Sequence, residues 1–289
     1  MIGLILQSLR PRQWPKNFFV LAGLLFTLDK PHPLRDYIAV ASAFAVFCVL
    51  SGVVYLVNDC LDVGLDRKHP AKRNRPIASG RLPTRTAWTA AAVLLVIGLG
   101  VSFCVHRTLG IISVIYVALM LLYSLYLKNA VLLDVMVIGA GFVVRAVAGT
   151  EVLEVSISPW LLMCTMLLAL FLAVAKRRGE LVLLEDKAVN TRMSLEHYSI
   201  PFLDQLINIT ASATIIAYAL YTFGSETAKT HRYMIATLPF VLYGIFRYML
   251  LVHRGSGTDN PEMLLVTDRP LLLDIALWAA ACAIVIAIK

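Results

Sequence analysis

The sequence predicts an all-α, polytopic membrane protein with nine transmembrane helices. Of its 289 residues, 59% are hydrophobic and only 15% are charged, whereas a soluble domain has about 25% charged residues. The mean hydropathy is +0.78. Apolar stretches of about 20 residues recur along the chain, and each is long enough to cross a hydrocarbon core of about 30 Å as a helix.

The order of apolar stretches predicts one membrane domain that spans residues 1–289, because no polar stretch is long enough for a soluble domain. Two connections, 59–85 and 176–205, are long, and the others are mostly brief turns. The expected spans, of which the first and sixth are short, are 14–28, 37–58, 86–105, 109–127, 132–149, 159–175, 206–223, 234–252 and 271–288.

The basic residues predict the orientation of these helices. Eighteen Lys and Arg residues lie at the amino terminus or in the connections on its side, and six lie on the opposite side. The positive-inside rule therefore predicts a cytoplasmic amino terminus and cytoplasmic long loops. This sorting by loop also explains most of the net charge of +8, so we expect no nucleic-acid partner.

The cysteines and the amino terminus exclude two further features. The five cysteines are scattered, odd in number and mostly within apolar stretches, which favours buried side chains over disulfides or a zinc site. In residues 1–12 the charges follow the apolar stretch, so we expect no cleavable signal peptide.

An acidic motif follows the second span, in the pattern Asn58-Asp59-x-x-Asp62-x-x-x-Asp66. If the helix continues, steps of 100° place the three carboxylates within an arc of about 60°. Carboxylates so close together repel one another unless a cation joins them. Mg²⁺ prefers oxygen ligands and is usually held by one or two carboxylates and substrate phosphates. The alternative is an ordinary solvated helix end.

A basic cluster comes directly after the acids and consists of Arg67, Lys68, Lys72, Arg73 and Arg75. The positive-inside rule alone accounts for about two of them. Acids that hold a metal, followed closely by bases, suit an anion whose charge exceeds what the metal neutralises.

The second long loop opens with Lys176, Arg177 and Glu180. One interpretation is a simple helix salt bridge, because Lys176 and Glu180 are four residues apart. The other is a second wall of the same phosphate site, with the bases on phosphate and Glu180 on the metal or a sugar hydroxyl.

Smaller signals lie at the predicted cytoplasmic ends of other spans, where we expect polar side chains to bind substrate, and these residues are Lys16, Asn17, Tyr123, Lys128 and Asp134. Asp134 near Lys128 could equally form a surface pair worth under about 1 kcal/mol.

Two further features have competing interpretations. Arg145 lies within the fifth span, where an arginine is a functional candidate, but its place near the outer end favours a side chain that reaches outward to water. In the last cytoplasmic loop, Pro261-Glu262 and Asp268-Arg269-Pro270 could cap helices or help to close a pocket.

The acidic motif after the second of nine spans resembles that of the UbiA-type intramembrane prenyltransferase superfamily, and the resemblance covers essentially the whole chain. It implies helices around a central cavity open to the cytoplasm, capped by loops 59–85 and 176–205. It also implies Mg²⁺ as the cofactor, held by Asp59, Asp62 and Asp66, and an isoprenoid diphosphate as the usual substrate.

The chain departs from typical members in the second motif, where Lys176-Arg177-Arg178-Gly179-Glu180 replaces an aspartate-rich stretch. Three other patterns are similar to one branch of the superfamily, and they lie in residues 10–17, 66–76 and 123–128. That branch moves 5-phosphoribose from phosphoribosyl diphosphate (PRPP) to a polyprenyl phosphate, on the way to arabinose donors for the cell wall. Its substrates carry two additional phosphate groups, which would require added bases.

The resemblance assigns roles to the predicted site. Asn58 orients the metal shell or the ribose, Lys72, Arg73 and Arg75 bind phosphates, and Lys176, Arg177 and Glu180 close the other wall. The alternative enzyme is a prenyltransferase with an aromatic acceptor, and a transporter is disfavoured because no related halves are visible. We expect a multi-pass protein of the bacterial inner membrane with a cytoplasmic active site. The oligomeric state stays open, a homo-oligomer included.

Overall fold

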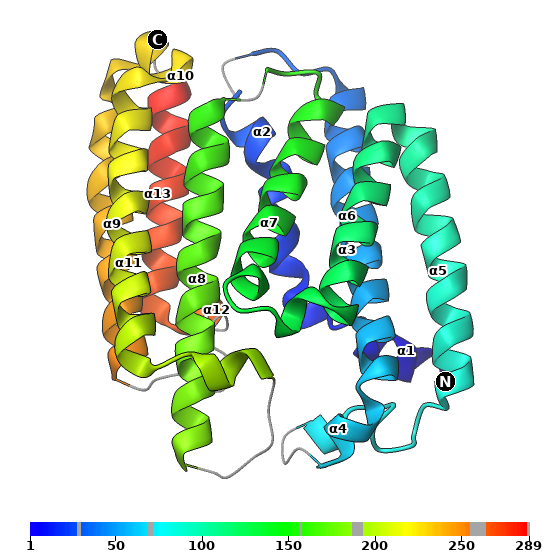
Figure 1. The fold of residues 1–289 in the computed structure, drawn as a ribbon. Helices are drawn as coiled ribbons and strands as arrows, with labels where there is room; N and C mark the ends of the chain where they lie inside the picture. The colour runs from blue at the N-terminus through cyan, green and yellow to red at the C-terminus, as the bar shows by residue number, and fades with distance from the viewer. Residues whose placement is uncertain (28–29, 69–71, 157, 187–192, 255–263, 288–289) are drawn as a thin grey trace. The chain divides into compact units, whose positions relative to one another are not determined.

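The computed structural model describes residues 1–27, 30–68, 72–156, 158–186, 193–254 and 264–287, and within these ranges every regular element is helical (Figure 1). Eight helical segments are long and apolar enough to cross a membrane, which confirms the predicted fold class. These are α3 (Leu34–Leu61), α5 (Thr84–Val105), α6 (Arg107–Leu125), α7 (Leu133–Val152), α8 (Pro159–Asp186), α9 (Ile200–Gly224), η5 with α11 (Arg232–His253) and α13 (Arg269–Ala287).

The remaining elements are short. They are α1 (Ile2–Ser8), η1 (Pro11–Leu21), α2 (Ala22–Leu25), α4 (Val63–Lys68), η2 (Lys72–Asn74), η3 (Leu127–Asn129), η4 (Met193–His197), α10 (Glu226–Thr230), η5 (Arg232–Thr237), which leads into α11 (Leu238–His253), and α12 (Leu264–Thr267).

The first predicted span, 14–28, is not a regular transmembrane helix. Its residues form the 3-10 helix η1 and the four-residue α2 instead. Pro15 lies inside η1, where it lacks the backbone N–H and disfavours α-helical geometry at the preceding residue.

The sixth predicted span ends too early. We placed its end at residue 175, but α8 continues to Asp186, so Lys176, Arg177 and Glu180 lie on a helix rather than in a loop. The charged composition of this stretch misled the prediction, because its arginines are paired within the fold, as described below.

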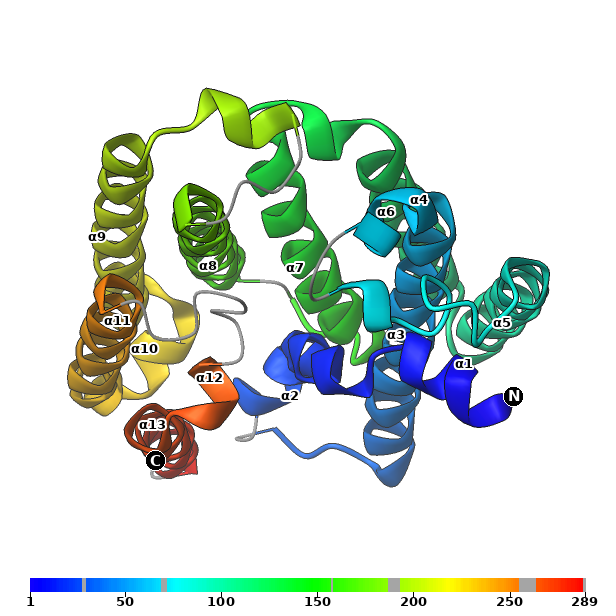
Figure 2. The same cartoon turned by 90° about the horizontal axis from the view of Figure 1, so that it is seen from below.

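The described chain forms two compact units. Unit 1 comprises Met1–Ala22, His32–Tyr126 and Val144–Val155. Here α3 packs against α5, and α5 packs against α6. Gly98 allows the close approach of α3 and α5, since a Cβ atom there would lie 2.8 Å from Leu50 Cδ2. Figure 2 shows α1 and α4 beside the end of α3.

Unit 2 comprises Gly23–Pro31, Leu127–Val143 and Ser156–Lys289. Its centre is the pair α8 and α9, and α11 packs against both α9 and α13. The buried tyrosine Tyr218 links three of its elements, because its hydroxyl lies 2.7 Å from Thr237 Oγ1 and accepts a hydrogen bond of 2.8 Å from Trp278 Nε1.

Candidate active site

The acidic motif lies where α3 gives way to α4 in unit 1. The helix does not run on unbroken, because α3 ends at Leu61 and Asp62 leaves helical geometry at φ −92° and ψ 10°. Backbone hydrogen bonds nevertheless bridge the break: Asp62 N donates to Asn58 O at 2.9 Å, and Asp66 N donates to Asp62 O at 2.8 Å. Asp59 and Asp66 therefore stay on one side of the chain, and both are buried.

Arg75 joins these two carboxylates. Its Nη1 donates to Asp59 Oδ1 at 3.1 Å and to Asp66 Oδ2 at 2.7 Å. The side chains of Asp59 and Asp66 are 2% and 5% exposed, whereas that of Arg75 is 25% exposed. The guanidinium thus covers a buried pair of acids from the accessible side.

A second arginine, Arg10, reaches the same oxygen. Its Nη2 donates to Asp59 Oδ1, and its guanidinium carbon lies 4.7 Å from the centre of the Tyr55 ring. The backbone of Arg10 is left-handed, with φ 53°, a conformation that costs a non-glycine residue about 1–3 kcal/mol. The preceding Leu9 is buried against Gly52, where an added Cβ would lie 2.8 Å from Leu9 Cδ2.

Arg10 was absent from the predicted site residues. The signal that could have found it is its place in the amino-terminal pattern Arg10-Pro11-Arg12-Gln13-Trp14, which we used only for the resemblance. A contact across 49 residues cannot be read from local spacing.

The turn after α4 holds Arg75 in position. Arg75 N donates to Lys72 O at 3.0 Å, and Arg67 Nε donates to Ala78 O at 3.2 Å. Ile77 packs in the buried core of unit 1 with residues of α3 and α5. Lys72 is partly buried and Arg73 is exposed, and their phosphate-binding roles stay predictions.

The acidic pair has the chemistry of a divalent-cation site. Two carboxylate oxygens, from Asp59 and Asp66, converge on one positively charged nitrogen of Arg75, so a cation already occupies the space between them. Both donors are oxygens, which Mg²⁺ prefers. Within the described residues no third acid, His or Cys completes a cluster with them, and the role of Asp62 as a ligand stays a prediction.

Arg145 occupies a buried polar centre elsewhere in unit 1, and our interpretation that it reaches outward to water is wrong. It is 5% exposed. Its Nε donates to Asn17 Oδ1 at 2.8 Å, and its Nη2 donates to Tyr116 OH at 2.7 Å. Asn17 is fully buried and also donates to Ser51 Oγ at 3.4 Å. Asn17 therefore anchors Arg145, while the predicted role of the adjacent Lys16 stays a prediction.

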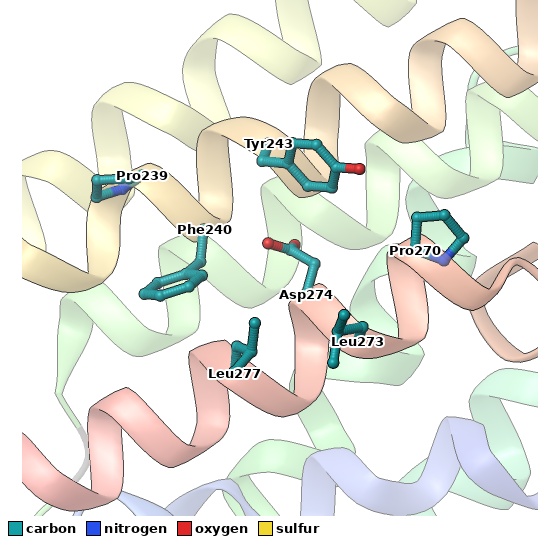
Figure 3. A pocket seen from close by; sticks show the side chains of 7 residues that line it. All are labelled: Pro239, Phe240, Tyr243, Pro270, Leu273, Asp274 and Leu277. Carbon is teal, nitrogen blue, oxygen red and sulfur yellow. The ribbon is translucent and has the colours of Figure 1, made fainter.

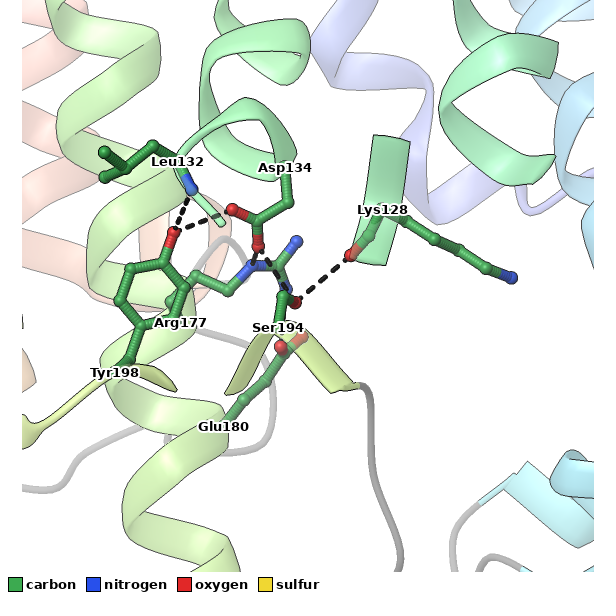
Figure 4. Close-up of polar contacts among 7 residues, drawn as sticks. All are labelled: Lys128, Leu132, Asp134, Arg177, Glu180, Ser194 and Tyr198. Carbon is green, nitrogen blue, oxygen red and sulfur yellow. Dashed lines mark hydrogen bonds and ion pairs between the residues drawn. The ribbon is translucent and has the colours of Figure 1, made fainter. Parts of the chain in front are cut away.

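A second charged group, in unit 2, surrounds Asp134 (Figure 4). Arg177 Nε donates to Asp134 Oδ2 at 2.7 Å, and Tyr198 OH donates to Asp134 Oδ1 at 2.8 Å. Tyr198 OH in turn accepts from Leu132 N at 2.8 Å. Burial raises the pKa of Tyr198 to about 12, and its hydrogen bond to Asp134 acts in the same direction.

This arrangement changes the interpretation of the second motif. Asp134 is fully buried, and Figure 4 shows the Lys128 side chain extending away from it, so the surface-pair interpretation is wrong. Arg177 is 1% exposed and also donates through Nη1 to Glu180. Arg177 is thus paired with two acids within unit 2. The substrate-binding roles of Tyr123, Lys128 and Lys176 stay predictions.

The structure confirms that Asp268, in the last predicted cytoplasmic loop, caps a helix. It accepts from Arg247 Nη2 at 2.9 Å and from Leu271 N at 3.0 Å, so it caps the start of α13. The hydrogen bond from Arg247 holds the pKa of Asp268 below its usual value. Pro261-Glu262 lies outside the described residues.

A pocket of about 370 Å³ lies between α11 and α13 in unit 2 (Figure 3). Sequence reasoning missed its one acid, Asp274, which is 8% exposed and packs against Gly244, where an added Cβ would lie 2.8 Å from Asp274 Oδ2. Its lining has no basic side chain to bind phosphate, and it consists of Pro239, Phe240, Tyr243, Pro270, Leu273, Asp274 and Leu277.

Comparison with known proteins identifies the family. Residues 17–267 match the model of the UbiA prenyltransferase family. The chain belongs to this family. This UbiA-family chain is 33% identical to the decaprenyl-phosphate phosphoribosyltransferase of Mycolicibacterium smegmatis, over 96% of its own length and 91% of the relative's. It is 36% identical to the enzyme of the same name from Corynebacterium glutamicum, over 95% and 84%.

A solved structure supports the UbiA fold. The UbiA homolog from Archaeoglobus fulgidus, bound to GPP and Mg²⁺, aligns with a TM-score of 0.75 and 16% identity over 99% of this chain and 100% of that one. At this identity the likeness concerns the fold alone. The family match and the eight apolar helices of the described residues together identify an integral membrane protein.

Proposed function

We propose that this UbiA-family transferase moves 5-phosphoribose from PRPP to a polyprenyl phosphate and releases diphosphate. The observation that carries the proposal is identity of 33–36% to decaprenyl-phosphate phosphoribosyltransferases over at least 95% of this chain. The site geometry supports it, because buried acids and accessible arginines lie together in unit 1.

In this proposal, Asp59 and Asp66, with Asp62, would hold Mg²⁺. The chemistry that the bound ion supplies is positive charge against the leaving diphosphate. Arg75 donates to the diphosphate oxygens from the same side as the acids. Lys72 and Arg73, on the turn before it, bind the additional phosphate of PRPP.

Bond changes in the transfer are simple. An oxygen of the lipid phosphate attacks C1 of the ribose, and the bond from C1 to the diphosphate oxygen breaks with its electron pair leaving on the diphosphate. The configuration at C1 inverts. A phosphate monoester has a second pKa near 6, so the acceptor is already ionised and needs no general base.

In the second motif, we revise the proposed role of Arg177 from binding phosphate to positioning the helix. We expect Arg177 and Asp134 to act as positioning residues, because each is buried and bonded to the other. Their contact fixes the part of α8 that carries Lys176 and Glu180, which keep the substrate-binding roles. Because Arg177 and Arg178 are paired with acids of unit 2, Lys176 is the base of this motif that we expect to bind substrate phosphate.

The proposed location is the bacterial inner membrane, with the amino terminus and the active site facing the cytoplasm. The distribution of basic residues supports this orientation. The proposed partners are PRPP, the polyprenyl phosphate and the lipid bilayer.

A direct assay tests the proposed reaction. Purified protein is incubated with Mg²⁺ and either labelled PRPP plus polyprenyl phosphate, or polyprenyl diphosphate plus 4-hydroxybenzoate. We expect labelled lipid product in the first mixture only. Product in the second mixture alone would instead support a prenyltransferase with an aromatic acceptor, as the family description allows.

A further inference from the structure

Two arginines of unit 1 share one carboxylate oxygen. Arg10 and Arg75 both donate to Asp59 Oδ1, and Arg75 also donates to Asp66. The four side chains carry two positive and two negative charges, so the group is neutral without any added ion. We call Arg10, Asp59, Asp66 and Arg75 the four-residue cluster.

Neutrality changes when a divalent cation arrives. Mg²⁺ binds carboxylate oxygens at about 2.1 Å, whereas Arg75 Nη1 now lies 3.1 Å and 2.7 Å from the same two groups. An ion between the carboxylates would lie within a few ångströms of two guanidinium groups, and like charges at that distance repel strongly where water is scarce. The arginines and the ion therefore compete for the acids.

The exposure of the four side chains shows which groups can move. The carboxylates are 2% and 5% exposed, but the side chains of Arg10 and Arg75 are 26% and 25% exposed. The backbone at Arg10 is held by the neighbouring Leu9, which packs against Gly52. Its long side chain can swing outward while its Cα stays in place.

Diphosphate gives the released arginines a new partner. Planar guanidinium groups bind phosphate oxygens through paired hydrogen bonds. A diphosphate held by the metal would lie on the accessible side of the buried acids, where Arg10 and Arg75 are exposed.

We propose that Arg10 and Arg75 are exchangeable counter-ions: they neutralise Asp59 and Asp66 when the site lacks metal, and they transfer to the diphosphate when Mg²⁺ and substrate bind. This inference rests on the proposed function and adds Arg10 to the substrate-binding residues. It makes binding of metal alone weak and binding of metal with diphosphate strong.

Binding measurements without turnover test the exchange. Mn²⁺ replaces Mg²⁺, and electron paramagnetic resonance measures its affinity for the purified full-length protein with and without inorganic pyrophosphate. For Arg10→Ala we expect the affinity for Mn²⁺ alone to rise about tenfold, because one competing charge is gone. The affinity of the Mn²⁺-loaded protein for pyrophosphate should fall about tenfold.

Matched variants separate this effect from damage to the fold. Arg12→Ala removes the same charge from an exposed position two residues away and should change neither affinity. Arg10→Lys keeps the charge and should bind Mn²⁺ alone as the wild type does. Arg75→Ala, like Arg10→Ala, should raise the affinity for Mn²⁺ alone and lower the affinity for pyrophosphate. Its melting temperature reports whether it folds.

The possible results distinguish the two proposals. If wild-type protein binds Mn²⁺ with pyrophosphate but Arg10→Ala leaves the affinity for Mn²⁺ alone unchanged or lower, the exchange is wrong. If wild-type protein binds no Mn²⁺ even with pyrophosphate and transfers no phosphoribose, the proposed function is wrong and the exchange falls with it.

Discussion

Asp59 shows how much depends on a single carboxylate. It is 2% exposed and accepts from two arginines, so its charge is retained at considerable desolvation cost. A buried acid beside partly exposed bases is typical of a metal or substrate site.

The first prediction concerns that charge. We expect Asp59→Asn to lower kcat/KM for phosphoribose transfer at least about a hundredfold, since an amide cannot supply the negative charge that holds the metal. Steady-state assays with labelled PRPP measure the change. The control is Glu226→Gln, which removes an exposed acid, and wild-type rates in Asp59→Asn would refute the metal assignment.

Arg145 gives a prediction about stability. Replacing it with Leu would leave the buried Asn17 Oδ1 and Tyr116 OH without their donor, at a cost of about 2–4 kcal/mol in the free energy of unfolding. Denaturant unfolding in detergent measures it. Arg107→Leu, at an exposed position, should cost far less, and equal losses for the two variants would show that the buried hydrogen bonds of Arg145 do not stabilise the fold.

At the scale of helices, the end of α8 was the main error of the sequence prediction. Lys176, Arg177 and Glu180 resemble a loop by composition, but Arg177 is buried because Asp134 neutralises it. That partner lies 43 residues away, so no local pattern could reveal it. The helix therefore continues for eleven residues beyond the predicted end.

A double-mutant cycle tests this ion pair. Removing either partner leaves a buried charge, so Asp134→Asn and Arg177→Met should each destabilise by about 3 kcal/mol. The double variant should cost clearly less than the sum of the two. Additive effects in unfolding experiments would mean that the pair is not coupled.

Alkaline pH probes the same group through Tyr198. Its pKa is about 12 in the folded protein, above the usual value of about 10. The contribution of protonated Tyr198 to the free energy of unfolding is therefore complete below about pH 10 and is lost as the pH rises toward 12. Unfolding measured across this range should show a steeper loss for wild type than for Tyr198→Phe, and parallel curves would contradict the assignment.

Replacing Asp274 on α13 should raise the free energy of unfolding, whereas the preceding substitutions should lower it. It is 8% exposed within a membrane-spanning helix, and among the described residues no hydrogen bond to its carboxylate is found. Asp274→Leu keeps a similar shape and removes a buried polar group, so we expect stability to rise by about 1–2 kcal/mol. A loss of stability would show that the carboxylate has a binding partner.

At the scale of the whole molecule, hydropathy and charge predicted the fold class and most of the spans, because a bilayer demands long apolar helices. Eight of the nine expected spans are helices long enough to cross a membrane. The first is replaced by the 3-10 helix η1, which contains Pro15 and packs against α3. The spacing predicted that Asp59 and Asp66 lie close together, and both accept from Arg75, while their role as metal ligands stays a prediction. The partners Arg10, Arg75 and Asp134 acquire their roles through contacts that only the folded chain supplies.

The proposed function depends above all on Asp59 and Asp66, which we expect to hold a divalent ion against diphosphate. Anomalous diffraction from crystals grown with Mn²⁺ and pyrophosphate would locate this ion. We predict a manganese peak about 2.1 Å from carboxylate oxygens of both residues, with Arg10 and Arg75 turned to the pyrophosphate. Pyrophosphate bound elsewhere, or both arginines still paired with Asp59 and no ion between the acids, would contradict the claim.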